Sequence, residues 1–276
     1  MATLKTSTHP TDLFYEDIGT GQPVVLIHGW PLSCRMWEGQ VSALLDAGYR
    51  TITYDRRGFG HSGRPVKGYD YDTFANDLND LLTTLDLKKV ALVGFSMGGG
   101  EVARYIGKHG TARVASASFL GAVPPFLLQT PDNPDGAPKS LFDGMIAGVK
   151  KDRVNFLADF FEKFFGRNKD SDKVSDDVIA WAKAVAWMAS PIGTIECITA
   201  FGTTDFRADL SKCTVPTLVV HGDEDQIVPF EISGKKTAAT IKGSRLEVLK
   251  GGPHAFNATH GDELNRILLG FLKSVA

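Results

Sequence analysis

One serine lies in a sequence pattern that can expose its hydroxyl for nucleophilic attack. Residues 94–98 read Gly-Phe-Ser-Met-Gly, the G-x-S-x-G pattern, with Ser96 at its centre. An apolar run at 89–93 is typical of a buried parallel strand, and residues 98–106 can begin a helix. A sharp turn between strand and helix strains the serine backbone and places its hydroxyl at the positive end of the helix dipole. The alternative is a glycine-rich turn without chemistry, and the partners of Ser96 decide between the two.

A serine hydroxyl attacks at neutral pH only when a base accepts its proton and a third group orients that base. In proteins with this strand–turn–helix motif, the serine, the acid and the histidine follow one another along the chain in that order. His254 satisfies this order, because it follows the last predicted strand, 245–249, in a loop shaped by glycines and a proline. His260, six residues further on, is expected to be an ordinary helix-start residue. We therefore predict that His254 is the base.

The acid is expected in the loop after the preceding strand, 217–220, which carries three acidic residues. We predict Asp225, because it lies further from the strand end, where the loop can turn toward the histidine. Asp223 would then be a turn residue that hydrogen-bonds its own backbone. Some enzymes of this kind place the acid after the strand that follows the serine, but that position here reads Leu-Gly-Ala at 120–122. Because no acidic residue stands there, the acid is expected in the later loop.

A tetrahedral intermediate on Ser96 would need hydrogen-bond donors for its oxyanion. One is the backbone N–H of the next residue, Met97, and the second is expected from Trp30, in the loop after strand 23–27. Pro31 follows at once and restricts the backbone of Trp30, which would turn the Trp30 carbonyl toward the site. A rigid loop proline without a chemical role is the alternative for Pro31.

Further side chains are candidates for positioning a substrate. His28 lies at the end of strand 23–27, beside the predicted site, and the alternative for it is a structural histidine that shapes the loop. Residues 139–207 are rich in aromatic side chains, most of which are expected to pack. A few are expected to line a pocket over Ser96, because binding sites favour domain interfaces and apolar walls. We predict that the positioning residues are Pro31, His28, Phe126 and Phe160.

These residues need a scaffold, and the order of elements predicts one. Strands at 13–18, 23–27, 49–54, 89–93 and 113–120 alternate with helices at 35–47 and 71–85 and with the helix after Ser96, which predicts an α/β protein with a mostly parallel sheet and helices on both faces. After 139–207, which reads as helical, strands at 217–220 and 245–249 and helices at 229–240 and 262–275 resume the pattern. We predict a core of residues 1–121 and 209–276 and an inserted helical cap of residues 122–208.

Composition narrows the function classes. A chain of 276 residues with a formal net charge of −2 gives no electrostatic reason to expect nucleic acid or an anionic membrane as a partner. Three cysteines, Cys34, Cys197 and Cys213, form no metal-ligand spacing and are expected to be free thiols in a reducing compartment. The start has no apolar segment of a signal peptide, and no apolar run reaches the length of a membrane span. We therefore expect a cytoplasmic protein without a bound metal.

Together the motifs resemble a known family. The segments at 28–32, 54–60, 94–105, 221–225 and 253–254 look like those of the cofactor-free, non-heme chloroperoxidases, a branch of the α/β-hydrolase superfamily that includes aryl esterases and a γ-lactamase. The likeness covers nearly the whole chain and is weaker across 139–207. It implies the α/β-hydrolase fold, a Ser96–His254–Asp225 triad, and no metal or haem. Members are often oligomeric, so a homo-oligomer is among the expectations.

The resemblance also implies an activity. Such enzymes form an acyl-enzyme from a small carboxylic acid or ester, and hydrogen peroxide takes the acyl group to give a peracid, which oxidises halide in solution. Pro31 resembles the perhydrolase members, in which the preceding carbonyl is thought to hold peroxide. Met97 fits the esterase members, whereas threonine is familiar at this position among the peroxidases. We therefore expect a serine hydrolase of small carboxylic esters, with a small acyl substrate and hydrogen peroxide as partners.

Two other functions stay open at this stage. A lactamase or amidase would use the same triad, and the cap would set the substrate. A non-catalytic small-molecule binding protein is the alternative from another class, although all three triad positions are filled. Dehalogenases and epoxide hydrolases of this fold use an aspartate nucleophile, so Ser96 argues against both.

Overall fold

The computed structural model describes residues 2–167 and 173–275, and it is built on one sheet. Eight strands lie in the order β1-β2-β4-β3-β5-β6-β7-β8. β1 and β2 pair antiparallel, as do β2 and β4, and every later pair is parallel. The α/β class and the mostly parallel sheet are therefore confirmed. The strands are β1 (Ala2–Lys5), β2 (Asp12–Ile18), β3 (Pro23–Ile27), β4 (Arg50–Tyr54), β5 (Val90–Phe95), β6 (Val114–Leu120), β7 (Thr217–Gly222) and β8 (Arg245–Leu249).

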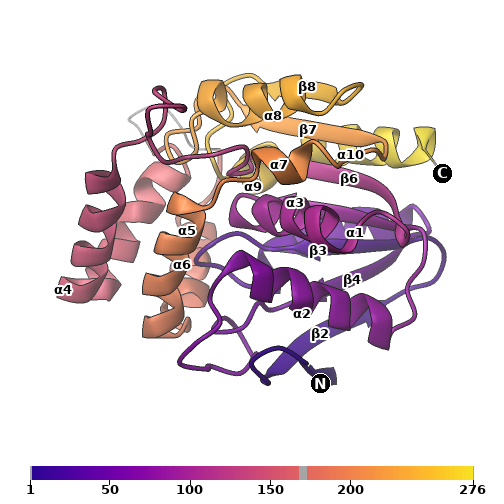
Figure 1. Cartoon of the computed structure of the whole chain (residues 1–276), viewed down its shortest axis with the longest axis horizontal. Helices are drawn as coiled ribbons and strands as arrows, with labels where there is room; N and C mark the ends of the chain where they lie inside the picture. The colour runs from indigo at the N-terminus through magenta and orange to yellow at the C-terminus, as the bar shows by residue number, and fades with distance from the viewer. Residues whose placement is uncertain (1, 168–172, 276) are drawn as a thin grey trace.

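Helices cover both faces of the sheet (Figure 1). On one face α3 (Met97–His109) packs against α2 (Tyr71–Thr84) and α7 (Arg207–Leu210), which in turn contacts α8 (Gly234–Thr240). On the other face α1 (Glu38–Asp46) packs against α9 (Phe256–Thr259) and α10 (Gly261–Ser274). The central strands β3, β5 and β7 are almost entirely buried, as parallel strands covered on both sides must be. The sheet therefore holds its strand ends in fixed positions.

The cap helices α4 (Lys139–Phe164), α5 (Asp176–Trp187) and α6 (Pro191–Thr203) stand together at one end of the sheet, at the left of Figure 1. They all fall within the segment predicted as a helical cap, although its boundaries at 121/122 and 208/209 stay predictions. α4 is interrupted at Asp152, where φ is −158° and ψ is 92°. The Asp152 carboxylate accepts a hydrogen bond from the Asn155 N–H at 3.0 Å, so this residue begins a new helical segment as an N-cap does.

The structure differs from the predicted elements at three places. β1 has no counterpart among the predicted strands, because its four residues lie at a sheet edge, three of them exposed, and carry no clear alternation of apolar and polar residues. The helix expected at 229–240 is a 3-10 turn, η2 (Phe230–Ile232), followed by α8, because Ser233 between them has a non-helical backbone. The helix expected at 35–47 likewise begins as a 3-10 turn, η1 (Cys34–Trp37), capped by the Ser33 hydroxyl.

No single helix within residues 2–167 and 173–275 is long and apolar enough to cross a membrane. α5 and α6 would be long and apolar enough only when taken together, and the two helices meet at a bend of 99°.

A buried ion pair ties the helix after Ser96 to the sheet. Arg56 and Glu101 are both inaccessible, and the Arg56 Nε donates to Glu101 Oε2 at 2.8 Å. The Tyr54 hydroxyl donates to the other oxygen of Glu101, and the Arg56 Nη2 donates to the His28 carbonyl at 2.8 Å. Burial raises the pKa of Glu101, although the Arg56 guanidinium beside it acts in the opposite direction. The pair thus joins the ends of β3 and β4 to α3.

Replacing Glu101 by alanine should lower the free energy of unfolding by about 3–5 kcal/mol, because it leaves the Arg56 guanidinium buried and uncompensated. Urea unfolding measures this. The matched control is Glu247→Ala, which removes the partner of Arg245 in a largely exposed pair and should cost less than about 1 kcal/mol. Similar losses in the two variants would contradict a special role for the buried pair.

Gly98 permits close packing under the strand ends. A Cβ atom at this position would lie 2.3 Å from the Ile27 carbonyl oxygen, a backbone atom that cannot easily move. Gly98→Ala should therefore lower the free energy of unfolding by about 2 kcal/mol or more. Gly39→Ala in α1 is the control, because an added Cβ there meets nothing within 4 Å and helix propensity favours alanine by about 1 kcal/mol. If Gly98→Ala unfolds at the same urea concentration as Gly39→Ala, the close approach of α3 to β3 is wrong.

Candidate active site

Ser96 stands at the sharp turn between β5 and α3. Its backbone has φ of 54° and ψ of −119°, a conformation that is costly for a residue with a side chain. The Ser96 N–H donates to the Leu120 carbonyl at 2.8 Å, which fixes the turn against the end of β6. The serine is 6% exposed. The turn therefore projects the Ser96 side chain beyond the strand ends while its backbone stays in the sheet.

Ser96, His254 and Asp225 lie in hydrogen-bond contact. His254 Nε2 lies 2.9 Å from Ser96 Oγ, and His254 Nδ1 lies 2.6 Å from Asp225 Oδ2. The histidine is fully buried, with its ring 4.9 Å from that of Phe95 and 5.0 Å from that of Phe164. A carboxylate can only accept from Nδ1–H, so Nε2 is left with a lone pair for the serine proton.

The structure brings Asp225, and not Asp223, to the histidine. Asp225 Oδ1 accepts from the N–H groups of Ile227 and Val228 at 2.9 and 2.8 Å, which leaves Oδ2 for His254. Burial raises the pKa of Asp225, but the charge of His254 and the hydrogen bonds of the neighbouring histidines outweigh this and hold the pKa below its usual range. Asp223 instead accepts from the Gly251 N–H at 2.6 Å and so shapes the loop that carries His254.

The two predicted oxyanion donors flank Ser96. Met97 is the first residue of α3, and the loop with Trp30 lies against the serine, since a Cβ on Gly29 would come within 3.1 Å of Ser96 Cβ. Neither the Trp30 nor the Met97 N–H takes part in the turn, loop and side-chain hydrogen bonds of the described residues. Both N–H groups therefore stay candidates for the oxyanion site. The Trp30–Pro31 peptide is cis, and the indole N–H of Trp30 donates to the Thr194 carbonyl of α6 at 3.1 Å.

His28 does not face a substrate, and its predicted positioning role is corrected. The ring is fully buried, its Nε2 accepts from the Arg56 N–H at 2.9 Å, and its Nδ1 donates to the Gly29 carbonyl at 2.9 Å. Burial and the adjacent Arg56 guanidinium lower the pKa of His28, which matches a neutral ring. The ring thus joins its own loop to the loop after β4, so His28 fits the alternative of a structural histidine that shapes the loop.

A cavity of about 60 Å³ opens onto Ser96 between the sheet and the cap. Phe160 lines it, as predicted, with its ring 5.1 Å from that of Trp30. Phe126 does not line it and instead packs beneath the Arg207 guanidinium, 5.3 Å from the ring centre, so its positioning role is also corrected. The other lining side chains are almost all apolar: Val123, Leu127, Leu141, Phe142, Met145, Phe201, Ile227 and Val228.

Several of these walls were missed from the sequence. Ile227 and Val228 follow Asp225 directly, and an apolar pair beside a predicted catalytic acid is a signal that could have been used. Leu141 and Met145 are four residues apart in α4 and so share one face of that helix. The spacing of apolar residues in α4 does not predict which face of the helix lies toward Ser96.

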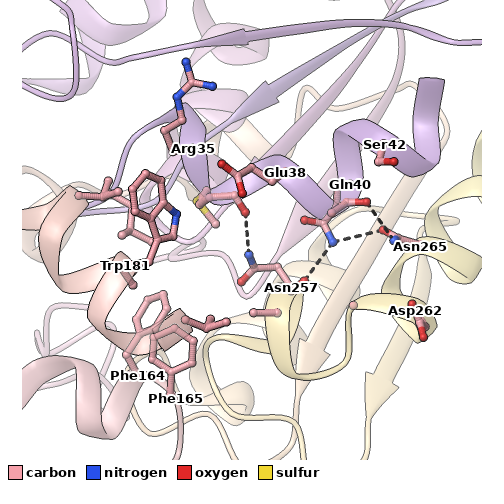
Figure 2. A pocket seen from close by; sticks show the side chains of 18 residues that line it. Arg35, Glu38, Gln40, Ser42, Phe164, Phe165, Trp181, Asn257, Asp262 and Asn265 are labelled. Atoms are coloured by element: carbon pink, nitrogen blue, oxygen red, sulfur yellow. Dashed lines mark hydrogen bonds between the residues drawn. The ribbon is translucent and has the colours of Figure 1, made fainter. Parts of the chain in front are cut away.

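A larger cavity, about 470 Å³, lies away from the serine, between α1, α5 and α9 (Figure 2). Trp181, Phe164 and Phe165 form one side of it. On the other side Gln40 donates to Asn265 Oδ1 at 3.2 Å and to the Asn257 carbonyl at 3.0 Å. None of the predicted triad or oxyanion residues lines this cavity. Of these two cavities, the smaller one is lined by Ser96, whose hydroxyl contacts His254.

Within the described ranges, no group of three or more histidine, cysteine, aspartate or glutamate side chains is placed to hold a metal ion. The three cysteines are buried and unpaired.

Comparison with known proteins places the chain in a family. Residues 22–260 match the family described as alpha/beta hydrolase fold. The chain is 48% identical to the non-heme chloroperoxidase CPO-A1 of Kitasatospora aureofaciens, over 97% of this chain and 98% of that one. It is 39% identical to a bifunctional esterase/perhydrolase of Acinetobacter calcoaceticus, over 98% and 99% of the two chains. The crystal structure of a bromoperoxidase from Bacillus anthracis superposes with a TM-score of 0.95 at 54% identity and covers 99% of both chains. The chain therefore belongs to the α/β hydrolase fold family, in the branch of the non-heme chloroperoxidases and their esterase relatives.

Proposed function

We propose that this enzyme hydrolyses small carboxylic esters through an acyl-enzyme on Ser96 and, as a linked activity, transfers the acyl group to hydrogen peroxide. The observation that carries the proposal is the buried His254 ring, 2.9 Å from Ser96 Oγ and 2.6 Å from Asp225 Oδ2. The esterase/perhydrolase relative supports the pairing of the two activities, because its chain matches this one almost end to end.

In the first half-reaction Ser96 Oγ forms a bond to the acyl carbon while its proton passes to His254 Nε2. Asp225 stabilises the imidazolium that results. The N–H groups of Trp30 and Met97 stabilise the charge that develops on the carbonyl oxygen. The tetrahedral intermediate then breaks its bond to the alcohol oxygen, which takes the proton from His254. The alcohol leaves, and the acyl group remains as an ester on Ser96.

In the second half-reaction an acceptor attacks the same acyl carbon, with His254 as its base. Water as acceptor gives the carboxylic acid, and hydrogen peroxide gives the peracid; in both cases Ser96 Oγ takes the proton back. A free carboxylic acid enters by the reverse of the water step. Halide oxidation then occurs outside the protein, through the released peracid. Pro31 is proposed to assist by fixing the Trp30 carbonyl toward the peroxide, and the close approach of this loop to Ser96 supports this.

The cavity supports short acyl chains. Its volume of about 60 Å³ is small, and sites for drug-sized ligands measure roughly 300–1,000 Å³. Its walls offer almost no hydrogen-bonding groups apart from Ser96, so the acyl group is recognised by size and apolarity. A cytoplasmic location and a homo-oligomeric state stay predictions; the three buried, unpaired thiols support a reducing compartment.

Two rates measured on one preparation test the proposal: hydrolysis of a short aryl ester, and peracid formation from acetate with hydrogen peroxide. Ser96→Ala should lower both by about 10⁴-fold or more, because it removes the nucleophile. Ser42→Ala is the matched control, since Ser42 is exposed and lies in the remote cavity, and it should leave both rates unchanged.

The pattern of losses separates the alternatives. Ester hydrolysis without peracid formation would contradict the proposed roles of hydrogen peroxide as acceptor and of Pro31 in positioning it. Folded wild-type protein that is inert in both assays and does not react with a serine-directed phosphonate would contradict catalysis and favour a binding protein. Labelling by the phosphonate without either activity would contradict small esters as the substrates and would favour amides or lactams.

Phe160→Ala should shift the preference toward longer acyl chains, because it removes a wall of the cavity. Each additional buried methylene is worth about 0.8 kcal/mol, so the ratio of kcat/KM for hexanoate over acetate esters should rise about tenfold if roughly two more methylenes are accommodated. Phe126→Ala is the control: it deletes the same side chain outside the cavity and should leave the ratio unchanged. An equal shift in both variants would show that general loosening of the structure, and not the wall at Phe160, sets the preference.

A further inference from the structure

A second histidine contacts the acid of the proposed triad. His221 lies in β7 and is fully buried. Its Nε2 is 2.8 Å from the Val228 carbonyl oxygen and 3.3 Å from Asp225 Oδ2, the same oxygen that contacts His254. The proposed mechanism gives His221 no role.

The surroundings of His221 decide where its proton lies. Both neighbours of Nε2 are acceptors, so this nitrogen must carry a proton, which points mainly to Val228 and is shared with Asp225. Nδ1 has no hydrogen-bond partner among the described residues. The ring cannot turn freely, because Phe230 lies 5.7 Å from it and a Cβ on Gly234 would lie 2.4 Å from Nδ1.

His221 thus completes a closed set of contacts around one carboxylate. The N–H groups of Ile227 and Val228 hold Oδ1, and the carbonyl of the same Val228 accepts from His221. His221 and His254 share Oδ2. A buried carboxylate with donors on both oxygens has its orientation fixed. The loop that carries Asp225 is therefore anchored to the strand from which it departs.

We propose that His221 is a positioning residue, which holds Asp225 in the orientation that His254 requires. This inference rests on the proposed function, because it assigns His221 a task within that mechanism. His221 touches neither Ser96 nor the cavity, so its effect on the reaction must pass through Asp225. A purely structural histidine would fill the same space and donate to the Val228 carbonyl without any effect on the orientation of Asp225.

Two nearly isosteric substitutions separate these roles. His221→Gln keeps an N–H donor close to the position of Nε2, whereas His221→Met has a similar length and volume but no donor. We expect His221→Met to lower kcat for the short ester about tenfold with KM changed less than twofold, since its effect falls on the proton transfer. His221→Gln should restore kcat to within about threefold of wild type, because its side-chain amide can donate to Asp225.

A double-mutant cycle tests whether the effect passes through Asp225. In an Asp225→Asn background, His221→Met should change the residual kcat by less than about twofold, because the carboxylate that His221 positions is gone. The inference is overturned if His221→Met costs the same factor with and without Asp225, or if Gln and Met lower kcat equally in folded protein.

A measurement on the wild-type protein keeps the test valid if the Met variant does not fold. Nitrogen-15 NMR of labelled histidine reports which ring nitrogen carries the proton. We expect His221 to carry it on Nε2 at the pH of the assay, and a proton on Nδ1 alone would overturn the inference. The two proposals fail separately: absence of Ser96-dependent ester hydrolysis refutes the proposed function, whereas an Nδ1 proton refutes only the role of His221.

Discussion

The geometry of the proposed triad depends on the hydrogen bond between His254 Nδ1 and Asp225 Oδ2, which is 2.6 Å long and joins two fully buried side chains. It requires the loops after β7 and β8 to meet, and the 2.9 Å contact of His254 with Ser96 adds the turn after β5. The parallel pairing of β5 with β6, β6 with β7 and β7 with β8 fixes these three strand ends relative to one another. Burial disfavours a charged carboxylate, so the site supplies Asp225 with donors on both of its oxygens.

The scaffold could be predicted because its signals are local and strong. β3, β5 and β7 are short apolar runs with turn residues at their ends, and α2 and α10 have apolar residues at helical spacing. What escaped prediction depends on tertiary contacts. β1 is a strand because β2 pairs with it. The break at Ser233 reflects a non-helical backbone conformation that the residue types there do not predict.

The site divides in the same way. Chain order and strand-end placement predict His254 and Asp225, and the topology of the sheet brings the loops that carry them together. Proximity to the serine was not enough for His28, whose ring nitrogens bond to the Gly29 carbonyl and to the Arg56 N–H after β4. Of the two cap phenylalanines predicted to position a substrate, Phe160 lines the cavity and Phe126 packs under Arg207. Phe160 lies on α4, whose orientation the sequence does not indicate, and Phe126 lies in the irregular segment before that helix.

The proposed mechanism requires that Ser96 carries an acyl group during turnover. Rapid acid quenching of the enzyme as it hydrolyses an aryl acetate, followed by peptide mass spectrometry, tests this directly. We expect an acetyl group on the peptide that contains Ser96, in an amount that falls when hydrogen peroxide is added as a competing acceptor. An ester consumed with no acetyl on Ser96, or with acetyl on another residue that turns over at the catalytic rate, would contradict it.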